Sequence, residues 1–205
     1  MRLAIAAVLL VGSVAAAAYG DVPTLQFGGA DVRLQGATPG ARFTWVAMGR
    51  DNSAHNAQLR IVRGLASADG QGGYDLGFKL DPLYSVWAVA AVDEPWTLLE
   101  TRSGCPLSPQ VIEVTAAAGA TRFTVTSGII HGNYVRPNGS SWTFTATDGS
   151  SADGDGTPNG RIEIVLATLA KFTASGDLPA AIQAGDKLLL LDPHQLRARI
   201  FEVAP

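Results

Sequence analysis

The residues best suited to chemistry in this chain form an acidic, glycine-rich run over residues 148–160. Within it, oxygen-bearing side chains alternate with small residues at Asp153, Asp155 and Asn159. Calcium takes about six to eight oxygen ligands at once. A loop with acids at alternating positions can turn them toward one ion, and its glycines let backbone carbonyls join them. The run therefore predicts a calcium site.

The expected ligands are oxygen donors of the loop and its flanks: Asp148, Asp153, Asp155, Thr157 (through its carbonyl), Asn159 and Glu163. The same residue types are also favoured in solvated turns, without any metal. Both interpretations stay open. A second acidic, glycine-rich segment at 69–75 has fewer oxygen donors, and there we expect a turn.

The core of this run resembles the calcium loop of dockerins and EF-hands, in the pattern Asp153, Gly154, Asp155, Gly156 and Asn159. The chain has Ser at position 151 and Ile at position 162, where that family carries acidic ligands. The resemblance therefore implies an EF-like calcium loop between strands, with a structural role, and does not imply a complete EF-hand.

Aromatic residues offer a second kind of site. Trp45, Trp87 and Trp142 lie in apolar runs, where a role in the core is expected. Trp96 follows a break in the strand pattern and is the tryptophan we expect at an exposed edge. There it could stack on a sugar, which makes a carbohydrate-binding module the first alternative function.

A hydrolase is the second alternative, with His131 as its base. The three histidines are scattered and have no zinc-ligand spacing. No nucleophile motif accompanies His131. The single cysteine, Cys105, cannot form an internal disulfide. We expect it to be buried or, in a secreted chain, to pair with another molecule.

The N-terminus has the pattern of a cleaved secretory signal peptide over residues 1–20. One positive charge, Arg2, precedes an uncharged apolar stretch that ends in small residues. Because Arg2 is the only charge removed, the formal net charge changes from −3 to −4. This mildly acidic balance argues against nucleic acid as a partner, and no membrane contact is expected after cleavage. A polysaccharide or protein partner fits the composition, and the oligomeric state stays open.

The elements that must position these residues are short apolar runs separated by Gly, Pro, Asn and Asp, which is typical of an all-β protein. Candidate strands lie at 31–35, 42–48, 58–65, 74–78, 84–92, 97–101, 110–115, 121–126, 132–136, 142–147, 187–191 and 199–203. The runs 121–126 and 142–147 alternate as half-buried antiparallel strands do. The run 84–92 is apolar on both faces, which predicts a central strand. Asn138 and Gly139 predict a hairpin turn.

The segment 162–172 fits either a helix or a strand, and its β-branched start favours a strand. Residues 21–93 have the length of one immunoglobulin-like sandwich, and residues 94–205 would form a second β-domain. One larger sandwich over 21–205 is the alternative. No internal repeat is convincing.

Several segments of the C-terminal half, at 134–137, 141–142, 159–162 and 184–193, resemble a group of uncharacterised secreted bacterial β-proteins. The resemblance implies secretion and a β-architecture and leaves function open. Together these observations predict a secreted, non-enzymatic, all-β protein, an extracellular structural or adhesion module with a structural calcium loop.

Overall fold

A computed structural model describes residues 22–28, 31–51, 59–77, 80–102, 104, 107–147, 160–167, 173–174 and 178–205. In these residues the regular elements are β-strands, and every strand pairing is antiparallel. The all-β prediction is confirmed. Among these same residues, no helix is long and apolar enough to cross a membrane.

The first half of the chain is a sandwich of two sheets. One sheet has the order β1 (Thr24–Gly28), β2 (Asp31–Gln35), β5 (Tyr74–Asp75). The other has the order β4 (Leu59–Ser67), β3 (Arg42–Asp51), β6 (Leu80–Ala91), β7 (Thr97–Thr101). This alternation of successive strands between two packed antiparallel sheets is the immunoglobulin-like arrangement that the sequence predicts.

The second half is also a sandwich of two sheets. One has the order β12 (Arg161–Val165), β9 (Arg122–Thr126), β8 (Glu113–Thr115). The other has the order β13 (Thr173–Ala174), β11 (Ser141–Thr147), β10 (Ile129–Val135), β14 (Lys187–Asp192), β15 (Arg197–Glu202).

The two halves share one topology. If β13 is set aside as an extra edge strand, β8, β9 and β12 match β1, β2 and β5, and β11, β10, β14 and β15 match β4, β3, β6 and β7. The chain therefore contains a structural repeat that the sequence does not reveal, because each copy uses different residues to fill the same pattern of inward positions.

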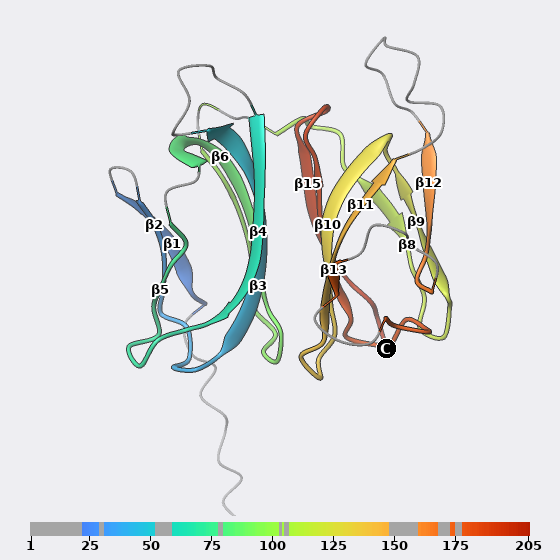
Figure 1. Cartoon of the computed structure of the whole chain (residues 1–205), viewed down its shortest axis with the longest axis horizontal. Helices are drawn as coiled ribbons and strands as arrows, with labels where there is room; N and C mark the ends of the chain where they lie inside the picture. The colour runs from blue at the N-terminus through green and yellow to red at the C-terminus, as the bar shows by residue number, and fades with distance from the viewer. Residues whose placement is uncertain are drawn as a thin grey trace, which may run out of the picture.

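The four sheets stack as four layers, with the larger sheet of each half facing the other (Figure 1). A hydrophobic core fills each sandwich, and a third core lies between the two larger sheets. Strand β6 serves two of these cores. Trp87 and Val89 point into the first sandwich, while Val86 and Ala88 point into the third core. The prediction of a strand covered on both faces is confirmed.

Local sequence patterns account for most elements. Phe123 and Val125 on β9 are buried, as the alternation predicts. The hairpin between β10 and β11 turns at Asn138 and Gly139, where Gly139 has a φ of 92° that favours glycine. Residues 162–165 lie in β12 as a strand.

The predicted boundary at residue 93 is wrong by one strand. The break at 93–96 is the turn of a hairpin, because β7 pairs with β6 and completes the first sandwich. The change from one sandwich to the next therefore falls after Thr101 and before Glu113, the first residue of β8. The alternative of one larger sandwich does not describe these four layers.

Candidate functional site

The junction between the two sandwiches combines apolar packing with buried hydrogen bonds. Side chains such as Met48 on β3 and Leu189 on β14 fill the third core. In the same layer, Asn133 Nδ2 on β10 donates to Thr44 Oγ1 at 2.8 Å and to the carbonyl of Trp45 at 2.8 Å. Because buried N–H donors need acceptors, these two bonds of Nδ2 favour one arrangement of the two sheets.

A second buried contact crosses the junction at Lys187, which is 4% exposed. Its Nζ donates to the carbonyls of Ala91, at 2.9 Å, and Glu94, at 2.6 Å, on the first sandwich. Burial lowers the pKa of the Lys187 ammonium, while nearby acids such as Glu202 oppose this effect. A charged group that leaves water needs such partners, so Lys187 also holds the halves in one orientation.

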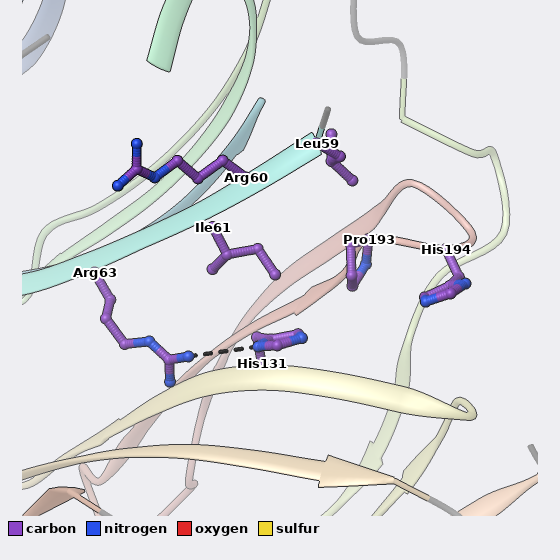
Figure 2. A pocket seen from close by; sticks show the side chains of 7 residues that line it. All are labelled: Leu59, Arg60, Ile61, Arg63, His131, Pro193 and His194. Carbon is purple, nitrogen blue, oxygen red and sulfur yellow. Dashed lines mark hydrogen bonds between the residues drawn. The ribbon is translucent and has the colours of Figure 1, made fainter. Parts of the chain in front are cut away.

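A cleft of about 550 Å³ opens at the edge of this junction. It lies between β4 of the first half, β10 of the second, and the turn that joins β14 to β15 (Figure 2). Its lining residues are Leu59, Arg60, Ile61, Arg63, His131, Pro193 and His194.

Successive side chains of β4 point to opposite faces of the strand, and one of these faces borders the cleft. Ile61 and Arg63 extend from β4 toward β10, while Arg60 extends along the other side of the strand (Figure 2). Arg60 Nη1 forms an ion pair with Asp51 Oδ2 at 2.9 Å. Ile61 packs against the third core. Arg63 is therefore the cation that β4 directs into the cleft.

The guanidinium of Arg63 is partly buried and bonded to neutral groups. Its Nη1 donates to the carbonyl of Phe144 at 3.1 Å, and its Nη2 lies 3.4 Å from His131 Nδ1 and 3.5 Å from Thr145 Oγ1. Among the described residues, no Asp or Glu forms an ion pair with Arg63. Burial lowers the pKa of Arg63, but a guanidinium stays charged in proteins.

Burial and the charge of Arg63 keep His131 in one protonation state. Burial first, and then the charge of Arg63, lower its pKa from 6.5 to about 4, while Asp192 acts in the opposite direction and His194 adds slightly to the lowering. The imidazole is therefore neutral at pH 7. Because Arg63 can only donate, Nδ1 accepts, and the proton must sit on Nε2. Nε2 lies on the side of the ring away from Arg63 (Figure 2).

This geometry suits binding an anion better than abstracting a proton. A general base works best with a pKa near the working pH, and that of His131 is about 4. Among the described residues, its hydrogen-bond partners are Arg63 and Thr145 Oγ1, at 3.2 Å. Neither is a carboxylate that would orient the ring as a base.

The predicted calcium ligands Asp148, Asp153, Asp155, Thr157 and Asn159 lie outside the described residues. The sixth, Glu163, lies on β12 with its side chain exposed, and it forms an ion pair with Arg122 of the neighbouring strand β9. Within the part of the chain that the structure describes, no group of three or more His, Cys, Asp and Glu side chains could hold a metal.

The second acidic segment forms the expected turn. Asp69 Oδ1 accepts from the backbone N–H groups of Gln71 and Gly73, at 2.8 Å each, and Oδ2 accepts from Arg33 at 2.9 Å. These backbone hydrogen bonds, and then Arg33, lower the pKa of Asp69. The carboxylate is thus used to close the turn.

The expectation of an exposed Trp96 is wrong. Trp96 is 9% exposed and belongs to the first core, with its ring 6.2 Å from that of Phe43. The hairpin between β6 and β7 folds the residue inward, and its Nε1 donates to Glu94 Oε2 at 2.7 Å. In this conformation Trp96 presents no flat face on which a sugar could stack.

Sequence reasoning considered His131 and missed Arg63. The available signal was in the pattern of β4, where Arg63 falls on the same face as Leu59, Ile61 and Leu65. A charged residue on the apolar face of a strand requires a partner or a function. The contact with His131, 68 residues away, depends on the packing of the two halves.

No family model and no curated protein sequence matches this chain. A comparison with solved structures finds red sea bream transglutaminase, at 11% identity and a TM-score of 0.24, over 89% of this chain. This chain spans about 30% of the length of that one. A likeness at this level carries no argument about fold or activity.

Proposed function

We propose that this protein is a secreted, non-enzymatic structural or adhesion module in which two immunoglobulin-like sandwiches act as one rigid body. The observation that supports this most is the junction between the larger sheets. It combines the third apolar core with the buried hydrogen bonds of Asn133 and Lys187 to the first sandwich.

A module of this kind must transmit force or hold ligands at a fixed distance without bending at its centre. Domains in one chain move relative to each other by default, unless a large apolar interface joins them. Here the interface core includes residues from β3, β6 and β14. The buried amide and ammonium penalise any sliding, because sliding would leave them without partners.

Pulling the mature chain by its two ends tests this mechanical role. We expect both sandwiches to remain intact up to one unfolding event that extends nearly the whole chain. Two well-separated events at different forces, one per sandwich, would contradict the proposal. Secretion is tested separately, by mass spectrometry of the exported protein, which should begin at Tyr19 or Asp21 after cleavage.

The acidic run over 148–160 is proposed to bind calcium and to stiffen the second sandwich, on the strength of its sequence pattern. An ion that binds only the folded state stabilises it by mass action. Millimolar calcium should therefore raise the melting temperature of the wild type, and the double variant Asp153→Ala, Asp155→Ala should abolish the rise. An unchanged melting temperature in the wild type would remove calcium from the account.

A polysaccharide or a protein surface is the proposed partner of the module. The sugar-binding version of this proposal loses support because Trp96 is buried in the first core. Retention on insoluble polysaccharide by the wild type, lost in Trp96→Ala with the fold intact, would restore it. Retention that is unaffected by this substitution would place any sugar contact elsewhere.

A further inference from the structure

The cleft between β4, β10 and the β14–β15 turn contains a cation that the described fold leaves without a counter-charge. Arg63 is partly buried, and burial lowers its pKa. Its bonds go to a carbonyl, a hydroxyl and a neutral imidazole. A guanidinium has five N–H donors, so these contacts leave donors for a further partner.

Two acidic residues near the cleft, Asp51 and Asp192, interact with groups other than Arg63. Asp51 pairs with Arg60 on the opposite side of β4. Asp192 is fully buried, accepts from Ser127 Oγ, and accepts from the backbone N–H groups of His194 and Gln195 at 2.9 and 3.0 Å. Among the described residues neither carboxylate forms an ion pair with Arg63, so its guanidinium has no counter-ion in direct contact, although the charge of Asp192 is felt at His131.

We propose that this cleft binds a small organic carboxylate, with the carboxylate on the N–H groups of Arg63 that its protein contacts leave over, and its apolar part against Ile61, Leu59 and Pro193. The residues of both sandwiches are needed, because Arg63 belongs to the first and His131 to the second. The site therefore exists only while the junction is closed.

The chemistry of the walls selects this class of ligand. One guanidinium next to a neutral imidazole balances a single negative charge, which a carboxylate carries and a phosphate exceeds. The remaining lining is mainly aliphatic, from Leu59, Ile61 and Pro193, so it favours a carbon chain over a polyhydroxylated ring. The volume of about 550 Å³ lies in the range of small-molecule sites.

The test is an NMR titration of the full mature protein with hexanoate, using the ring proton signals of the histidines, and with hexanamide as the neutral match. The signal of His131 is assigned by comparison with His131→Gln. We expect hexanoate to shift this signal saturably, and hexanamide to bind at least about tenfold more weakly, because charge-assisted hydrogen bonds are the stronger kind. Acetate should bind more weakly than hexanoate, since it lacks the chain that contacts the aliphatic wall.

Two substitutions make a matched pair. Arg63→Gln should weaken hexanoate binding by about tenfold or more, while Arg122→Gln should leave it within about twofold, because Arg122 lies on β9, outside the lining of the cleft. Equal binding of hexanoate and hexanamide, no saturable shift of His131, or unchanged binding in Arg63→Gln would overturn the proposal. If circular dichroism shows that Arg63→Gln does not fold, the wild-type comparison of hexanoate with hexanamide decides alone.

Discussion

Lowering the pH should destabilise the protein through His131, in a window set by its two pKa values. In the unfolded chain the imidazole has its ordinary pKa of 6.5, while in the folded protein burial and the charge of Arg63 lower it to about 4. Between these values the unfolded chain binds the proton and the folded protein does not. Stability from this source is thus complete above pH 6.5 and falls as the pH drops toward 4.

The magnitude follows from the same two values. A tenfold difference in proton affinity corresponds to about 1.4 kcal/mol, so the step from 6.5 to about 4 sets a ceiling of about 3 kcal/mol. Because the imidazole borders an open cleft, solvent screening reduces this to ~1–3 kcal/mol. The groups around it that set the value are Arg63 on β4, Asp192 on β14 and His194 in the following turn.

The assay is urea unfolding at pH 7.5, 5.5 and 4, on the wild type and on His131→Gln. Gln keeps a polar group in the cleft and removes the titration. The loss of free energy of unfolding between pH 7.5 and 4 should be smaller in His131→Gln, by ~1–3 kcal/mol. Equal losses in the two proteins, or an NMR titration that places the pKa of His131 above 6, would refute the reasoning.

Three further substitutions probe the packing, each measured by urea unfolding. Asn133→Ala should cost ~1–3 kcal/mol, because it removes two buried hydrogen bonds across the junction; a loss below about 0.5 kcal/mol would contradict this. Asp186→Ala should cost ~3–5 kcal/mol, because it leaves the largely buried Arg136 without its counter-charge, and a neutral effect would show that the pair is not buried in solution. Gly132→Ala should cost ~1–3 kcal/mol, because its new methyl group meets an aromatic ring and a backbone carbonyl, while Gly70→Ala, which has open space, serves as the control.

The strands of this fold could be predicted where apolar residues alternate with polar ones or form one continuous run. The alternation at Phe123 and Val125, and the apolar run around Trp87, are properties of a few neighbouring residues. They predict which side of a strand is covered. They do not say which element covers that side, so the packing of the two larger sheets and the repeated topology could not be predicted from the sequence.

The candidate site could not be predicted from local patterns, because it depends on how strands far apart in the sequence pack together. Arg63 and His131 are adjacent only because β4 and β10 lie against each other across the junction. Trp96 follows two acids and a Pro, a pattern that predicts exposure, yet the tight hairpin there turns it into the first core. The ambiguous segment after residue 160 begins as a strand because its alternating Ile162 and Ile164 fill the second core.

We propose that the two sandwiches form one rigid unit, and scanning calorimetry of the mature chain tests this most directly. We expect a single reversible transition whose calorimetric and van't Hoff enthalpies agree, because the third core and the buried bonds of Asn133 and Lys187 make each half depend on the other. Two resolved transitions, or a calorimetric enthalpy about twice the van't Hoff value, would show that the halves unfold independently and would contradict the account.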